Sequence, residues 1–174
     1  MRNKYILLGV ILLLAMGFNR YQHSDYRTEK ILTSNKWHSL TEVYISPQTV
    51  QQNNFKLGPV SKMDLNSNIK YLTNKTYIRE SYIKLYNNKD EELAEINIAD
   101  LGKWSSKDGY IFAEPQEYID ISSEEQKGLS KEEIEVFKKL FEMETRQIRH
   151  LDKVNRNTIL LTGIDNSSRV LFAN

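Results

Sequence analysis

Short stretches rich in aromatic and β-branched residues, separated by turn-forming residues, constrain the fold of this chain more than any other sequence feature. These stretches cover residues 37–45, 60–65, 69–72, 76–86, 93–98 and 110–113, with one further short stretch at 118–121. Aromatic and β-branched side chains pack well on a pleated surface, which favours strands. Residues 73–75 and the Asp108-Gly109 pair separate neighbouring stretches, and Asp-Gly is a strong hairpin signal. The sequence therefore predicts an antiparallel β-meander that forms a barrel or a sandwich.

One segment near the C-terminus predicts a helix. Residues 130–149 contain no Gly or Pro, and Ser130 followed by Glu133 has the spacing of a capping box. Apolar residues recur there at helical spacing, so we expect a broad apolar face that packs against the barrel. This face comprises Ile134, Phe137, Leu140, Phe141 and Ile148, widened by Val136 and Met143. Residues 154–155, 158–164 and 169–173 predict the closing strands, the last two joined by a turn at 165–168.

The N-terminus carries the signal that places the chain in a compartment. Residues 5–18 contain no charge and follow Arg2 and Lys4, which is the pattern of export with the N-terminus held inside. Fourteen helical residues reach about 21 Å, short of a hydrocarbon core of roughly 30 Å, and this favours a cleaved signal peptide. The segment lacks a clean A-x-A cleavage site, and flanking side chains can extend the span by snorkelling. Residue physics alone therefore leaves a cleaved signal peptide and a retained anchor both open.

Composition and motifs argue against an enzyme, a metal-binding protein or a nucleic-acid-binding protein. The 174 residues suit one domain, and 24 basic against 23 acidic residues give a net charge of +1, without the basic excess of a nucleic-acid binder. The chain has no cysteine, which excludes disulfides, thiolate nucleophiles and Cys-ligated metals. A calcium-loop-like start at residue 64 fails because Ile69 stands at the Gly position and Lys75 at the Glu position. We therefore expect a non-enzymatic protein with no metal or other cofactor and no direct contact with nucleic acid.

Apolar and aromatic side chains in the predicted strands allow two interpretations. They can form an ordinary core, or they can line a chamber for one small apolar ligand, as in eight-stranded barrels of the lipocalin type. Our candidates for a chamber lining are Ile78, Tyr82, Ile83, Tyr110, Phe112 and Leu160. Which alternate set of residues points inward is not decided by the pattern, because neither set of the 76–86 segment is purely polar.

Several short motifs follow one another along almost the whole chain. They are ILTS (31–34) with Trp37, IKYL (69–72), GKW (102–104) with DGY (108–110), LF (140–141), VN (154–155), TILLT (158–162) and VLF (170–172). Each motif is weak alone, but their order, the chain length and the missing cysteines together resemble the ToxS family.

The resemblance implies an inner-membrane protein with one uncleaved span. In this chain it implies a cytoplasmic tail at residues 1–4, a transmembrane anchor at 5–21 and a periplasmic domain at 22–174. It also implies a mainly β fold, a lipocalin-like antiparallel barrel that is incomplete alone and carries one helix in its C-terminal half. The periplasmic domain of ToxR, a membrane-bound transcription factor, would complete the barrel, as VtrA does for the related VtrC.

The same resemblance implies a function. ToxS-like proteins stabilise ToxR, protect it from periplasmic proteolysis and help to form a chamber that senses bile salts, and none of their residues is catalytic. An alternative from another class is a self-contained, lipocalin-like periplasmic carrier of a hydrophobic small molecule.

Overall fold

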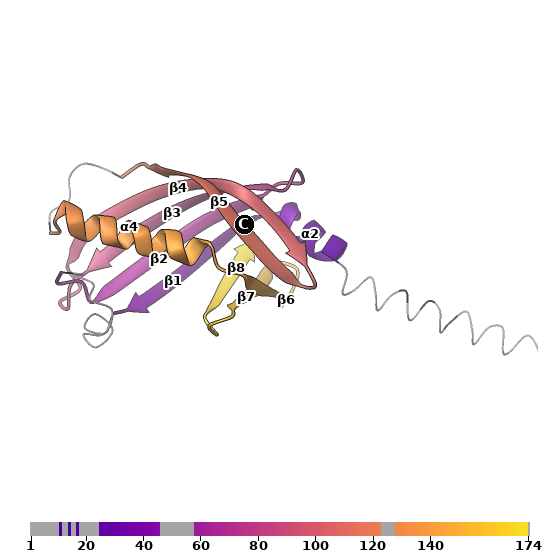
Figure 1. Ribbon diagram of the computed structural model, residues 1–174. Helices are drawn as coiled ribbons and strands as arrows, with labels where there is room; N and C mark the ends of the chain where they lie inside the picture. The colour runs from indigo at the N-terminus through magenta and orange to yellow at the C-terminus, as the bar shows by residue number, and fades with distance from the viewer. Residues whose placement is uncertain are drawn as a thin grey trace, which may run out of the picture.

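The structure is a computed structural model, and it describes residues 11, 14, 17, 25–45, 58–122 and 128–173. Within these residues, eight antiparallel strands form a closed barrel in sequential order (Figure 1). The strands are β1 (Lys36–Tyr44), β2 (Lys62–Tyr71), β3 (Thr76–Tyr86), β4 (Glu92–Lys107), β5 (Tyr110–Asp120), β6 (Arg149–Lys153), β7 (Thr158–Gly163) and β8 (Ser168–Ala173). Helix α2 (Asp25–Ser34) precedes β1, and helix α4 (Lys131–Thr145) connects β5 to β6. The predicted mainly β barrel with one helix in its C-terminal half is confirmed.

Several predicted short strands are parts of longer ones. The stretches 60–65 and 69–72 belong to one strand, β2, because Ser67 continues the alternation with its side chain buried inside the barrel. The 93–98 stretch extends into the sixteen-residue β4, and 110–113 joins 118–120 in β5. The sequence prediction divided these strands wherever small or polar residues interrupted the apolar pattern.

A bulge at Gly102 bends β4 where it pairs with β5. The register between β4 and β5 shifts between Leu101 and Gly102. A Cβ at Gly102 would lie 2.4 Å from the carbonyl oxygen of Glu114 and 2.8 Å from Cα of Pro115. Only glycine fits so close an approach, so this residue lets β4 curve around the barrel.

Two apolar clusters fill the barrel. The cluster beside α2, called here the proximal cluster, contains Leu32, Trp37, Ile69, Tyr71, Tyr77, Trp104, Ile111, Leu151, Ile159, Leu161 and Leu171. The cluster beneath α4, called the distal cluster, contains Val60, Leu65, Ile83, Leu85, Ala94, Ile96, Ile98, Ile134, Phe137 and Phe141.

Helix α2, which the sequence analysis did not predict, anchors one end of the barrel. Its Leu32 side chain is fully buried, and the Leu32 carbonyl accepts a hydrogen bond of 2.9 Å from Nε1 of Trp37. Most of the predicted anchor at residues 5–21 lies outside the described residues, although residues 11, 14 and 17 are helical. Among the described residues, no helix combines the length and the hydropathy needed to cross a bilayer.

The barrel closes through short contacts. Strand β5 pairs with β6 only at Tyr110 and Ile111, and β1 pairs with β8 only at Trp37 and His38. Among the described residues, 39–44 of β1 and 112–120 of β5 therefore have no strand partner on their second side. Helix α4 runs across the front of the barrel (Figure 1). Because the strand order is closed, the expected incompleteness is not confirmed.

Helix α4 begins as predicted but ends earlier. Both hydrogen bonds of the capping box are present, with the Ser130 side chain accepting from the Glu133 amide and the Glu133 side chain accepting from the Ser130 amide. The helix ends at Thr145, and Ile148 and Met143 are exposed, so the predicted apolar face was too wide. The predicted strand at 154–155 is wrong, because these residues form the turn after β6. The strand β6 itself was not predicted from the sequence.

The packing of α4 generates a stability prediction. Phe137 and Phe141 lie on the buried face of α4, where they are 2% and 5% exposed. Phe137→Ala or Phe141→Ala should therefore lower the free energy of unfolding by about 3–5 kcal/mol. Urea unfolding of residues 22–174 measures this loss. The control is Met143→Ala, which should change the value by less than about 0.5 kcal/mol because that side chain is 66% exposed. Equal small effects at all three positions would show that the helix face does not carry the packing.

Candidate functional site

A polar layer crosses the barrel interior between the two apolar clusters. We define this polar layer as Ser39, Ser67, Arg79, Ser81, Asp100, Glu144, Thr145, Arg149 and Arg169. Its position follows from strand alternation. On β3, Tyr77 belongs to the proximal cluster and Ile83 to the distal cluster, and the inward residues between them are Arg79 and Ser81.

An ion pair joins β3 to β4 within this layer. Arg79 and Asp100 lie directly opposite each other in the register of the two strands. Nε of Arg79 donates to Oδ1 of Asp100 at 2.7 Å and Nη2 donates to Oδ2 at 2.7 Å, which is a bidentate contact. The hydroxyl of Tyr77 donates to the same Oδ2 at 2.8 Å. Both oxygens of the fully buried Asp100 are thus engaged.

Burial and charge set the ionisation of these groups. Burial works against the charged guanidinium of Arg79, but the hydrogen bonds and charge of Asp100 outweigh it, and the pKa of Arg79 lies above its ordinary value. Burial is also the main cause that raises the pKa of the Tyr77 phenol, so this hydroxyl remains a hydrogen-bond donor. The guanidinium of Arg79 therefore stays charged, and both oxygens of the Asp100 carboxylate accept hydrogen bonds from Arg79 or Tyr77.

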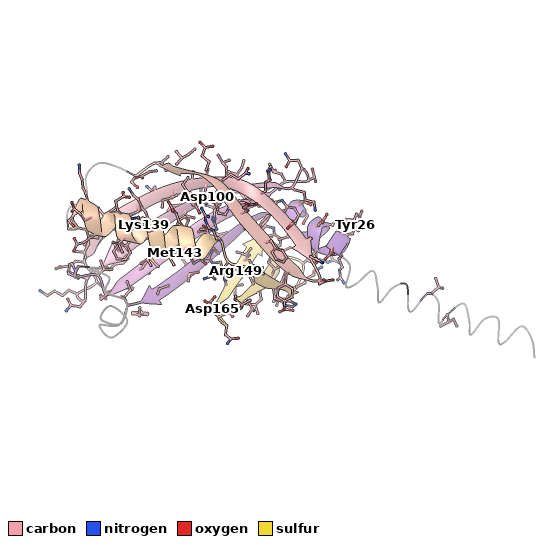
Figure 2. All side chains as sticks on the ribbon, viewed as in Figure 1. Tyr26, Asp100, Lys139, Met143, Arg149 and Asp165 are labelled. Atoms are coloured by element: carbon pink, nitrogen blue, oxygen red, sulfur yellow. The ribbon has the colours of Figure 1, made fainter. Side chains whose placement is uncertain are left out.

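A second charged group lies where α4 ends and β6 begins. Arg149 and Arg169 both donate through Nη2 to Oε1 of Glu144, the latter at 2.9 Å. Nη2 of Arg149 also donates to Oε1 of Gln147 at 2.9 Å. Oε2 of Glu144 is buried without a hydrogen-bond partner. Figure 2 labels Arg149 just beyond the C-terminal end of α4, and Asp100 on β4.

Three serines provide room for the long charged side chains. Ser39, Ser67 and Ser81 are directly opposite one another across β1, β2 and β3, and each is at most 3% exposed. The hydroxyls of Ser67 and Ser81 share a hydrogen bond of 2.9 Å. Ser39 and Ser67 line the same cavity as Arg79, Arg149 and Arg169, so larger residues at these two positions would fill space beside the arginines.

The polar layer borders a cavity of about 40 Å³. Its polar walls include Arg79, Arg149 and Arg169, and its apolar walls come from the proximal cluster, including Ile69 and Leu171. This space holds a few waters or one small polar group. It is far smaller than the roughly 300–1,000 Å³ of a pocket for a drug-sized ligand.

The predicted chamber residues are not brought together. Ile83 is 1% exposed and belongs to the distal cluster inside the barrel. The other five alternate with buried neighbours and lie on the outer face of three different strands: Ile78 and Tyr82 on β3, Tyr110 and Phe112 on β5, and Leu160 on β7. Tyr110 stacks edge-on against His150 at 5.0 Å. Five of the six thus face away from the interior cavity, and ligand contact at any of them stays a prediction.

Sequence analysis missed the arginines of the polar layer. The sequence offered one signal, and it concerned Arg79 alone. This residue alternates in step with Tyr77, Ile83 and Leu85, so strand alternation puts its side chain on the same face of the strand as these apolar residues. Among the residues that the structure describes, no group of three His, Cys, Asp or Glu side chains could hold a metal ion.

Comparison with known proteins places this barrel in a class of membrane-associated regulators. Residues 21–172 match the family model described as "Trans-membrane regulatory protein ToxS". The chain therefore belongs to the ToxS family, and the resemblance found in the sequence is confirmed.

Two curated relatives carry the same description. The chain is 38% identical over 175 residues to "Transmembrane regulatory protein ToxS" of Vibrio cholerae serotype O1, covering 100% of this chain and 99% of that protein. It is 36% identical over 154 residues to the protein of the same name from Vibrio parahaemolyticus serotype O3:K6, covering 88% of each.

The ion pair on β3 and β4 generates a second prediction. Asp100→Asn should lower the free energy of unfolding by about 3–5 kcal/mol, because Arg79 would stay buried without a counter-charge. The double variant Arg79→Met/Asp100→Leu should recover most of the loss, since neither charge is then buried. Urea unfolding compares the three proteins. Glu80→Gln is the control, because its ion pair with Lys36 is long (4.0 Å) and half exposed, and it should shift the value by less than about 0.5 kcal/mol.

Proposed function

We propose that this chain is an inner-membrane regulatory protein that binds and stabilises the periplasmic domain of a ToxR-like transcription factor. With this partner it forms a hydrophobic chamber that senses a bile salt or a similar amphipath. Membership of the ToxS family supports the regulatory role. The single structural observation that carries the proposal is the unpaired edge of β1.

The β1 edge offers a partner both backbone groups and apolar surface. Among the described residues, 39–44 pair with β2 on one side and with nothing on the other. Leu40 and Tyr44 are 67% and 75% exposed on this segment. A strand with unpaired N–H and C=O groups is a template for another chain, and β-augmentation uses such edges for recognition.

The opposite edge, on β5, is less available because α4 is fastened to it. Nζ of Lys138 lies 2.6 Å from Oδ2 of Asp120, and the hydroxyls of Tyr118 and Thr145 share a hydrogen bond of 2.8 Å. Burial opposes the charged form of Asp120, but hydrogen bonds from Lys138 and Ser122 hold the pKa of this carboxyl below its ordinary value, so the contact persists at neutral pH. We therefore assign the partner strand to β1.

The chamber would use the barrel interior beneath α4. The distal cluster, which contains Ile83, supplies apolar walls, and α4 is the element that covers them. Transfer of the apolar face of an amphipath to such walls contributes about 25 cal/mol per Å² before the entropy cost of binding. The cavity of about 40 Å³ borders the polar layer and the proximal cluster, so a ligand reaches the distal cluster only if α4 moves outward, and a partner on the β1 edge can stabilise that arrangement.

The proposed anchor predicts where the mature chain begins. If residues 5–21 are a retained span, N-terminal sequencing of the protein from the membrane fraction should start at or before Tyr5. The uncharged run after Arg2 and Lys4, without a good cleavage site, is the physical reason. A sequence that begins at Phe18 or later would show that the segment is a cleaved signal peptide.

A self-contained carrier is the second candidate, and the closed strand order favours it. The two functions differ in where ligand binds. Titration of a bile salt into each periplasmic domain alone and into their mixture, followed by heteronuclear NMR, separates them. The shared chamber predicts tight binding only in the mixture, whereas equally tight binding to this domain alone supports the carrier.

The assignment of β1 predicts the effect of a charge on its edge. Leu40→Lys should weaken the 1:1 complex with a ToxR-like periplasmic domain at least tenfold, because the ammonium must lose water in the interface. It should leave the unfolding free energy of the isolated domain within about 0.5 kcal/mol, since Leu40 is exposed. Analytical ultracentrifugation and protease protection of the partner give the readouts.

The matched control is Ile164→Lys, which places the same charge on an 81% exposed residue in the turn before β8. This control should bind and protect the partner as the wild type does. Equal weakening by both variants, or by neither, would contradict the assignment of the interface to β1.

A further inference from the structure

The charges inside the barrel do not balance. Among the described residues, the polar layer contains three guanidinium groups, of Arg79, Arg149 and Arg169, and two carboxylates, of Asp100 and Glu144. Asp100 is fully occupied by Arg79 and Tyr77. Two arginines therefore share one carboxylate, and they contact the same oxygen of it.

This excess charge is largely removed from water. The side chains of Arg149 and Arg169 are each 11% exposed, and that of Glu144 is 28% exposed. Burial, offset only in part by the charge of Glu144, lowers the pKa of Arg169. An unbalanced buried cation is costly, and proteins normally pair it with an anion.

The arginines also have donors to spare. Hydrogen bonds to the protein use only Nη2 of each, so Nε and Nη1 of Arg149 and Arg169 have no partner among the described residues. Both residues line the cavity of about 40 Å³, beside apolar side chains that include Ile111 and Leu161. The site thus combines paired guanidinium donors, a space large enough for a carboxylate or sulfonate group, and an adjoining apolar wall.

We propose that Arg149 and Arg169 bind the anionic head group of an amphipathic ligand, a carboxylate or a sulfonate, next to Glu144. The head group supplies the missing negative charge, and guanidinium groups contact such anions through paired N–H donors. The apolar body extends from this cavity past Glu144 toward the distal cluster beneath α4, which forms the proposed chamber. This inference rests on the proposed chamber and names the chemistry that selects its ligand.

Glu144 has a definite part in this arrangement. Its carboxylate already lies against both arginines and repels a second anion, so it weakens binding of the head group. Glu144 also belongs to the last turn of α4, which covers the distal cluster. An anionic head group bound beside Glu144 therefore lies next to α4, the helix that must move outward to admit the apolar body of the ligand.

The test uses the full chain with a ToxR-like partner in lipid nanodiscs and two probes that differ only in charge. Cholate has a carboxylate and methyl cholate does not, and both are titrated calorimetrically below the concentration at which micelles form, with empty nanodiscs as the blank. The wild-type complex should bind cholate at least tenfold more tightly than methyl cholate. Arg169→Met should abolish this preference by weakening cholate alone, and Glu144→Gln should strengthen cholate binding severalfold without affecting methyl cholate.

Two further measurements separate head-group binding from a structural role. Because Arg169→Met removes the excess charge and leaves Glu144 paired with Arg149, its urea midpoint should not fall below that of the wild type. Lys103→Met removes an exposed positive charge on β4 and should leave the affinity for both probes unchanged.

The outcomes distinguish this inference from the proposed function. Equal affinity of the wild type for cholate and methyl cholate, or equal weakening of both by Arg169→Met, would overturn the head-group site while leaving the chamber in place. Binding of neither probe to an intact complex would overturn the chamber and this inference together. A large fall in the urea midpoint of Arg169→Met would show that the arginine is structural.

Discussion

The buried ion pair between Arg79 and Asp100 is the constraint on which the rest of the interior depends. It links directly opposite positions of β3 and β4, the two strands with the longest shared register, and uses both oxygens of the carboxylate. A slip of one residue in either strand would turn the charge of that strand outward, leave the opposite charge buried without a partner and bring apolar residues to solvent. The pair also lies between the proximal and the distal cluster, so the barrel interior has two apolar clusters separated by the polar layer.

Helix α4 connects this interior to the surface that we assign to the partner. Its Phe137 and Phe141 complete the distal cluster, and the guanidinium of Arg79 lies 5.3 Å from the ring of Phe141. Glu144 in its last turn holds Arg149 and Arg169. The same helix crosses the front of the barrel (Figure 1), where β1 and β5 lack strand partners, so the proposed ligand beneath it and the proposed partner on the β1 edge would influence each other through this one helix.

Features that depend on neighbouring residues in the chain could be predicted, and features that depend on distant ones could not. The β3 strand, the Asp108-Gly109 hairpin and the capping box at Ser130 are encoded locally, and all three were predicted. The inward face of β3 was left undecided, because the partner of Arg79 is 21 residues away on another strand. Strand β6 was missed because it is short and polar and directly follows a helix whose apolar pattern continues to Ile148.

The central claim, that a partner strand pairs with the β1 edge, is tested most directly by hydrogen–deuterium exchange of the full chain alone and with a ToxR-like periplasmic domain. In the complex, the amides of residues 39–44 that point away from β2 should exchange more slowly, because new inter-strand hydrogen bonds cover them. The amides of β3, which are paired on both sides in the free chain, should not change. Unchanged exchange at 39–44 in a complex that has demonstrably formed would contradict the account.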